Sequence, residues 1–152
     1  MSRVEDRLKE LGLELPAVAA PLAAYVPAVR TGNHVYTSGQ LPFVKGVLPS
    51  TGRVGDGVTP GEAEQMAALC ALNAIAAVGS IVDLDDVVRI VKVVGFVASI
   101  PEFYGQPGVV NGASNLLGEV FGDAGVHARS AVGVSALPMN SPVEVEIIAE
   151  VR

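Results

Sequence analysis

The chain has few of the side chains that build common chemical sites. Charged residues make up 17% of its 152 residues, tryptophan is absent, and cysteine occurs once, at Cys70. A single cysteine excludes an internal disulfide and any Cys-x-x-Cys site. The histidines His34 and His127 are far apart and form no His-x-x-x-His or His-Glu-x-x-His pair, so we expect no metal site.

Basic residues are scarce as well. Lys and Arg number 10 against 16 Asp and Glu, so the formal net charge is −6. An acidic field repels phosphate backbones, and the basic residues form no run, so nucleic acid is not expected as a partner. There is no uncharged apolar span of about 18 residues, and MSRVEDRLKE lacks the apolar centre of a signal peptide. We therefore expect a cytoplasmic protein without a membrane partner.

Hydrophobic residues, in contrast, make up 50% of the chain. A chain of this length is expected to form one domain, over residues 1–152, with a sizeable core. So little charge leaves too few polar side chains to cover a monomer. The composition therefore predicts a homo-oligomer, in which copies of the chain cover part of the surface.

The local patterns predict seven elements after an N-terminal helix. In residues 1–15, Ser2 and Glu5 have the spacing of a capping box, and Val4, Leu8 and Leu11 form an apolar stripe. Thr59-Pro60-Gly61-Glu62 begins a long helix that reaches Gly79. The other predicted elements are strands at 24–30 and 34–40, a strand at 87–99, a helix at 109–122, and strands at 128–137 and 143–151, with loop at 43–57.

The order β-β-α-β-α-β-β predicts an α+β fold, in which two helices cover one face of a mixed sheet. The strand at 87–99 is apolar at nearly every position, which is typical of a strand covered on both faces. We expect a neighbouring subunit to cover the face that carries no helix.

Four motifs occur in a fixed order: TSGQLP at 37–42, ARS at 128–130, ALP at 136–138 and VEVEIIA at 143–149. Together they resemble the RidA (YjgF) family, whose fold is shared with one type of chorismate mutase and forms homotrimers. The longer N-terminus and the run VVNGASNLLGEVFGDAGVHARSAVGV resemble a subgroup with an added N-terminal helix.

The resemblance implies an enamine/imine deaminase, which hydrolyses reactive 2-iminoacids to 2-ketoacids and ammonia without a cofactor, in clefts between subunits. Carried over by motif, Arg129 would hold the substrate carboxylate and Glu144 would position the attacking water. Tyr25 would line the pocket, and Ser38 with Gly39 would offer a backbone contact. The family is also often labelled as endoribonuclease or translation inhibitor.

The residue types suit this chemistry. A guanidinium can bind a carboxylate through two parallel hydrogen bonds, and a nearby carboxylate can orient water and move a proton. Each residue also has a structural alternative. Arg129 could pair with Glu144 or Glu146 to close the sheet, Tyr25 could be plain packing with its hydroxyl on a backbone carbonyl, and Gly39 could serve a strand end. Glu144 and Glu146 share one strand face, which could simply be solvated.

One departure from the family pattern leaves the activity open. Many relatives have a cysteine two residues after the arginine, where this chain has Ala131. An alternative is therefore a trimer that binds a small carboxylate without turning it over. The endoribonuclease role is disfavoured by the net charge, and chorismate mutase activity rests only on the shared fold.

Overall fold

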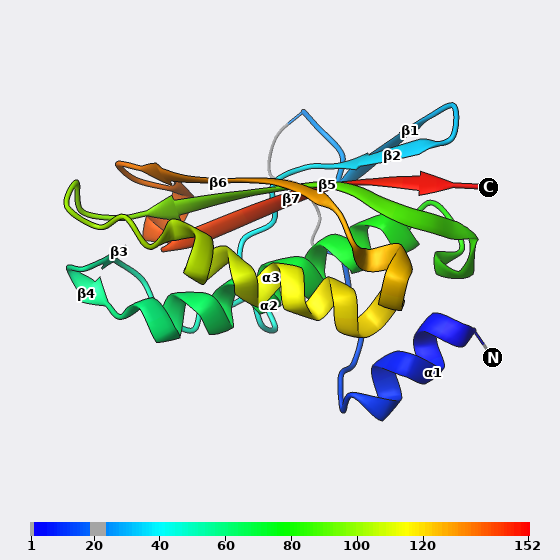
Figure 1. Ribbon diagram of the computed structural model, residues 1–152, viewed down its shortest axis with the longest axis horizontal. Coiled ribbons are helices and arrows are strands. Elements are labelled where there is room, and N and C mark those ends of the chain that lie inside the picture. The colour runs from blue at the N-terminus through cyan, green and yellow to red at the C-terminus, as the bar shows by residue number, and fades with distance from the viewer. Residues whose placement is uncertain (1, 19–23) are drawn as a thin grey trace.

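A five-stranded sheet forms one layer of the molecule, and two long helices, α2 (Pro60–Gly79) and α3 (Gln106–Phe121), form the other (Figure 1). The computed structural model describes residues 2–18 and 24–152. The other described elements, in chain order, are α1 (Arg3–Glu10), β1 (Ala28–Thr31), β2 (His34–Thr37), β3 (Arg53–Val54), β4 (Gly57–Val58), η1 (Leu84–Asp86), β5 (Val87–Ala98), η2 (Gly122–Gly125), β6 (Ala128–Val134), η3 (Pro138–Asn140) and β7 (Val143–Val151).

The sheet is mixed, with strand order β1-β2-β7-β5-β6. β5 and β6 run parallel, and the other neighbouring pairs are antiparallel. The central strand β7 is therefore the last strand in the sequence, and β1 and β6 form the two edges. This arrangement confirms the predicted α+β fold with two helices on one face.

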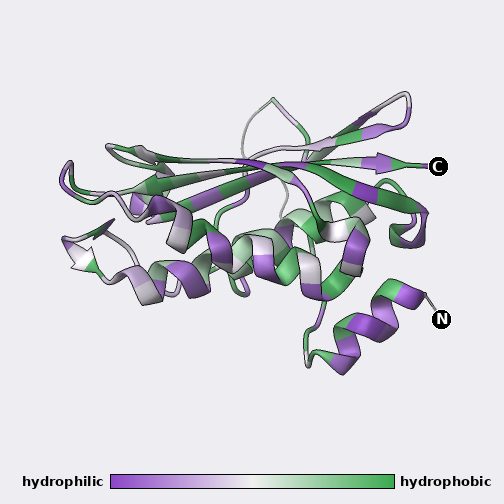
Figure 2. Cartoon of the chain, in the orientation of Figure 1, coloured by the Kyte–Doolittle hydropathy of each residue, from purple (hydrophilic) through white to green (hydrophobic). Residues whose placement is uncertain are grey.

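The N-terminal helix occupies only the first part of residues 1–15. The Ser2 hydroxyl accepts from the Glu5 amide as the capping box requires, and α1 ends at Glu10, shortly before the glycine that can terminate it. Gly12, at φ +71°, reverses the chain there, because glycine adopts this conformation without a steric cost. Val4 and Leu8 are buried, while the rest of α1 is mostly hydrophilic (Figure 2). No helix in the described part of the chain is both long and apolar enough to cross a membrane.

Other element boundaries also differ from the prediction. β1 and β2 each span only four residues, because the regular pairing is interrupted at Ser38-Gly39 before Gln40 pairs with Val145 of β7. The segment 43–57 contains the two-residue β3, which pairs in parallel with β4 across a tight turn. α3 begins at Gln106 instead of residue 109, since Pro107 suits the first helical turn.

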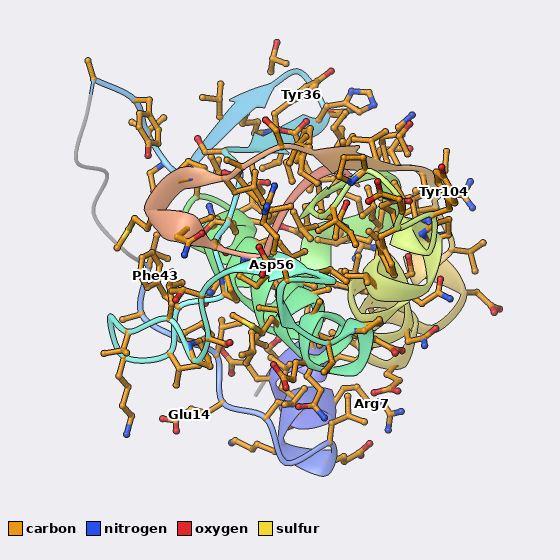
Figure 3. All side chains as sticks on the ribbon, turned by 90° about the vertical axis from the view of Figure 1, so that its left-hand side faces the viewer. Arg7, Glu14, Tyr36, Phe43, Asp56 and Tyr104 are labelled. Carbon is orange, nitrogen blue, oxygen red and sulfur yellow. The ribbon has the colours of Figure 1, made fainter. Side chains whose placement is uncertain are left out.

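The two faces of the sheet differ in their cover. On β7, Val143, Val145 and Ile147 are buried against the helices, whereas Glu144 and Glu146 point to the other face. We call this second side the open face. In Figure 3 it is the side that carries Tyr36, away from the helices. Within one chain the helix side of β5 is buried and the open face is only half-buried, so cover of the open face by a neighbouring subunit stays a prediction.

Candidate functional site

Arg129 lies on the edge strand β6 and faces α3. It pairs with Val93 of β5, whose side chain is fully buried under the helices, so both side chains point to the helix side of the sheet. Arg129 Nη1 donates to Asn111 Oδ1 at 2.7 Å and to Ser114 Oγ at 3.3 Å. Both partners come from the middle of α3, so the helix holds one end of the guanidinium.

The other two nitrogens of this guanidinium, Nε and Nη2, donate to no atom of the described residues. Within residues 2–18 and 24–152, no carboxylate lies within ion-pair distance of Arg129. Glu144 and Glu146 are on the opposite face, so the ion pair that would close the sheet is absent from this part of the chain. The Nε–Nη2 edge is the one that binds a carboxylate through two parallel hydrogen bonds.

The hydrogen bonds continue beyond Ser114. Its Oγ lies 2.9 Å from His127 Nε2, and His127 Nδ1 lies 2.6 Å from the carbonyl oxygen of Gly125. Asn111, Ser114 and His127 were not predicted from the sequence as neighbours of Arg129. A signal was present, because Asn111 and Ser114 are polar residues three apart in the run VVNGASNLL, whose other residues, apart from Asn115, are small or apolar.

Glu144 lies on the open face of β7 and is half-buried. Burial, and secondarily the negative charge of Glu146, raises the pKa of the Glu144 carboxyl above its usual value. Gly39 lies directly against this carboxyl: a Cβ on residue 39 would come within 2.5 Å of Glu144 Oε1. A carboxyl whose proton affinity is raised, next to an open backbone, can accept a proton from water near neutral pH.

Ser38 and Gly39 are held by the hairpin and by β7. The Ser38 hydroxyl donates to the Val26 carbonyl at 2.6 Å, and Gln40 exchanges two backbone hydrogen bonds with Val145. Gly39, between them, makes no backbone hydrogen bond to a described residue, so its N–H is available as a donor. The expected backbone contact of Ser38 and Gly39 with a substrate stays a prediction.

Tyr25 is 55% exposed, and its hydroxyl makes no hydrogen bond to any residue the structure describes. Tyr25 precedes Val26, whose carbonyl accepts from Ser38, so it lies on the segment next to Gly39. Its role in the pocket stays a prediction.

One chain thus brings together only part of the predicted site. Ser38, Gly39 and Glu144 lie side by side at the open face, with Tyr25 on the adjoining segment. Arg129 lies on the other face and at the edge, and β5 separates its strand from β7. A ligand bound by the helix-facing side of β6 cannot reach Glu144 of the same chain.

Two other kinds of chemical site, a metal centre and a reactive thiol, are not found within residues 2–18 and 24–152. Among the described residues, no group of three or more His, Cys, Asp and Glu side chains is placed to hold a metal ion. The Cys70 thiol is fully buried on α2, and burial raises its pKa well above the usual value, so it is not a nucleophile. Ala131 faces α3 and packs against the core, so no thiol accompanies Arg129.

Comparison with known proteins extends the likeness over the whole chain. A family model described as "YjgF/chorismate_mutase-like, putative endoribonuclease" matches residues 5–151. Protein TCP17 of Trypanosoma cruzi is 44% identical over 154 residues, covering 99% of this chain and 95% of TCP17.

Solved structures agree. Atu1372 of Agrobacterium tumefaciens, a protein of unknown function, is 47% identical, with a TM-score of 0.92, and the match covers 99% of this chain and 93% of Atu1372. E. coli TdcF, solved with bound serine, is 26% identical, with a TM-score of 0.64, and the match covers 90% of this chain and 93% of TdcF. With the family model matching nearly every residue and the same fold in these relatives, the chain belongs to the YjgF (RidA) family.

Proposed function

We propose that this protein hydrolyses 2-iminoacids to 2-ketoacids and ammonia, with Arg129 as the carboxylate clamp. The observation that carries the proposal is the Arg129 guanidinium: it is fixed at Nη1 by α3, has no carboxylate partner in the described chain, and keeps Nε and Nη2 available. An unpaired cation held in this way is expected to bind an anion, and the paired nitrogens select a planar carboxylate.

Glu144 supplies the proton transfers in this proposal. The substrate is an acid with a C=N carbon next to its carboxylate. Glu144 takes a proton from a water molecule while the water oxygen bonds to that carbon, and it passes this proton to the imine nitrogen, which gives a carbinolamine. Glu144 then takes the proton of the carbinolamine hydroxyl and delivers it to the amino nitrogen, so that ammonia leaves as the C–N bond breaks and the C=O bond forms. The Gly39 N–H lies beside Glu144 and can donate to the substrate or to the attacking water.

The two halves of this site must come from two chains, because Arg129 and Glu144 lie on opposite faces of one sheet. We propose a homotrimer in which the open face of one subunit meets the β6 edge of the next. This face is suited to burial, since Val29 and Tyr36 are 51% and 46% exposed and Val132 is 43% exposed. Light scattering behind a sizing column measures the mass of the assembly directly.

A relative supports the ligand class. E. coli TdcF holds serine in its structure, and serine, like a 2-iminoacid, carries a carboxylate next to a carbon bonded to nitrogen. The acidic net charge of −6 disfavours the nuclease activity named in the family description, because phosphate backbones are repelled.

The direct test is a coupled assay. An amino-acid oxidase generates 2-iminoacids from several amino acids, and semicarbazide traps whatever remains unhydrolysed. Wild-type protein is expected to lower the trapped imine, and Arg129→Ala to lose at least about 99% of this effect, because the clamp contributes two charge-assisted hydrogen bonds. Arg53→Ala is the matched control, since Arg53 pairs only with Asp56 on the surface.

Turnover by Arg129→Ala at the wild-type rate would remove Arg129 from the mechanism. The wild-type protein could instead leave the trapped imine unchanged for every substrate and still bind a 2-ketoacid at equilibrium. In that case the chain is a carboxylate-binding trimer. Ala131 is the residue that favours this second function, because it replaces the cysteine found in many relatives.

A further inference from the structure

A chain of hydrogen bonds anchors Arg129 to the protein interior. From Arg129 Nη1 it passes to Ser114 Oγ at 3.3 Å, then to His127 Nε2 at 2.9 Å, and ends where His127 Nδ1 meets the Gly125 carbonyl oxygen at 2.6 Å. It links strand β6, helix α3 and the residues just before β6, and none of its members is charged except Arg129 when the imidazole is neutral.

The chemistry of the groups sets the direction of this chain. A carbonyl oxygen only accepts, so His127 Nδ1 carries the hydrogen given to Gly125. In the neutral imidazole, Nε2 is then the acceptor, and the Ser114 hydroxyl donates to it. The Ser114 oxygen keeps its lone pairs for Arg129 Nη1. Every donor therefore points from Arg129 toward Gly125, and hydrogen bonds aligned in this way strengthen one another.

The far end of the chain is rigid. Gly125 is buried, and a Cβ at this position would collide with the backbone carbonyl of Leu117 in α3. Its own carbonyl is consequently fixed against the helix. Ser114 and His127 are half-buried, whereas the hydrogen bond from Arg129 to Asn111 is exposed to solvent. The Asn111 contact is the shorter one, at 2.7 Å against 3.3 Å, but the half-buried route through Ser114 is less open to competition from water.

We propose that Ser114 and His127 are positioning residues, which hold the Arg129 guanidinium with its Nε–Nη2 edge presented to the substrate carboxylate. This inference rests on the proposed function of Arg129. An arginine side chain has several rotatable bonds, and a ligand that must first order them binds more weakly. Fixing Nη1 from behind lowers that entropy cost before the substrate arrives.

The test compares four variants: Ser114→Ala, Ser114→Thr, His127→Phe and, as a matched control, Asn115→Ala on the exposed side of α3. Calorimetry measures the Kd for 2-oxobutanoate, and the coupled assay separates KM from kcat. Ser114→Ala is expected to raise Kd and KM about tenfold, with kcat within about twofold, because one charge-assisted hydrogen bond to the clamp is lost. His127→Phe is expected to act in the same direction, because the Ser114 hydroxyl loses the acceptor that orients its oxygen toward Arg129 Nη1. Ser114→Thr keeps the hydroxyl and should stay within about twofold of wild type in Kd and KM.

Unchanged Kd and KM in Ser114→Ala would overturn the proposal and leave Ser114 and His127 as a structural link between α3 and β6. A loss that Ser114→Thr fails to restore would also count against it, because the hydroxyl would then not be the group that matters.

A measurement without substrate separates this inference from the proposed function. In nitrogen NMR spectra of the ligand-free protein, His127 is expected as the Nδ1–H tautomer, and rotation of the Arg129 guanidinium should be slowed in wild type but not in Ser114→Ala. If the wild-type protein neither binds 2-oxobutanoate nor hydrolyses imines, the proposed function fails, and these spectra alone decide the positioning role. Equal guanidinium mobility in both proteins would refute it.

Discussion

The carboxyl group of Glu144 lies against the backbone of Gly39, so closely that a Cβ there would meet Oε1 at 2.5 Å and Cδ at 2.8 Å. Gly39→Ala is therefore expected to push the carboxyl aside. The displaced atoms are the far end of a flexible side chain, so the free energy of unfolding should change by less than about 1 kcal/mol. Turnover in the coupled assay should fall about tenfold or more, since the carboxyl loses its position near the water.

Gly61→Ala is the matched control for this substitution, because no atom lies within 4 Å of the Cβ it would add to α2. It should leave turnover unchanged and raise stability slightly, by about 0.5–1 kcal/mol, as alanine is a better helix former than glycine. Full activity in Gly39→Ala would show that Glu144 does not act from the observed position.

The raised pKa of Glu144 predicts the acid side of the pH profile. A proton acceptor must be deprotonated, so turnover should fall as the pH drops through the raised pKa, above the usual glutamate value of 4.5. Glu146→Gln removes the smaller of the two causes, and the acid limb should move to lower pH without returning fully to the ordinary position. Glu150→Gln, further along β7, is the control and should leave the acid limb at its wild-type pH. An acid limb that does not move in Glu146→Gln would contradict the assignment of the limb to Glu144.

Deprotonation of Glu144 should lower the stability of the fold, whereas it raises turnover. Its pKa is raised in the folded state, so the folded protein binds the proton more tightly than the unfolded chain does. The free energy of unfolding should therefore decrease as the pH rises from the usual glutamate range through the raised pKa. Glu144→Gln is expected to remove this decrease and increase the melting temperature at pH 7, while turnover falls about a hundredfold. A variant that loses both activity and stability would point to a structural role.

Arg129→Lys tests whether charge alone suffices. A lysine keeps the positive charge but offers a single ammonium, which cannot reproduce the paired contact or the link through Ser114. Turnover should recover by less than about tenfold over Arg129→Ala, which is the gain expected for one surviving charged hydrogen bond. Near wild-type turnover in Arg129→Lys, with Arg53→Lys as control, would mean that the fork geometry is not needed.

Asp85 of η1 caps the N-terminus of α1 from a distance in the sequence. Its carboxylate accepts from the Val4 and Arg3 amides and from the Ser2 hydroxyl, and these hydrogen bonds lower the pKa of Asp85 below its usual value of 3.8. Asp85→Ala is expected to speed hydrogen exchange of the α1 amides at neutral pH.

The pH dependence of this cap follows from the lowered pKa. The pKa of Asp85 is lower in the folded protein than in the unfolded chain, so its carboxylate stabilises α1 at any pH above the unfolded-state pKa. This contribution is lost as the pH falls through the folded-state pKa. Protection of α1 should therefore fade in acid for the wild type and be low throughout in Asp85→Ala. Asp86→Asn, whose partner Arg152 is exposed, serves as control.

Local signals account for the parts of the fold that sequence reasoning predicted well. Ser2 with Glu5 and Thr59 with Glu62 are capping pairs, and both form as predicted, since each depends on residues within one helical turn. The ends of strands depend on residues farther away in the sequence. β1 begins at Ala28 because the partner of Ala28, Thr37, is the last residue of β2. β3 was not predicted because two residues are too few to show an alternating pattern.

The residues of the candidate site could be named from the sequence, but the faces of the sheet on which they lie could not. Family motifs picked out Arg129 and Glu144, but their faces depend on how β6 and β7 register against β5, and no local pattern encodes this register. His127 looked unattached in the sequence, because its partner Ser114 comes from the preceding helix. Hydrogen bonds of this kind arise only when the tertiary fold places the two elements together.

The position of β7 determines the order in which the sheet can assemble during synthesis. Of the five strands of the sheet, the middle one, β7, leaves the ribosome last. The β1–β2 hairpin is made more than a hundred residues earlier, and the sheet neighbour of this hairpin is β7, where Tyr36 pairs with Ile148 and His34 with Glu150. During translation the hairpin must wait with its edge unpaired, while β5 and β6 can already join. A premature stop between β6 and β7 would leave two separate pieces of sheet, β1–β2 and β5–β6, each presenting an unpaired strand edge to other nascent chains.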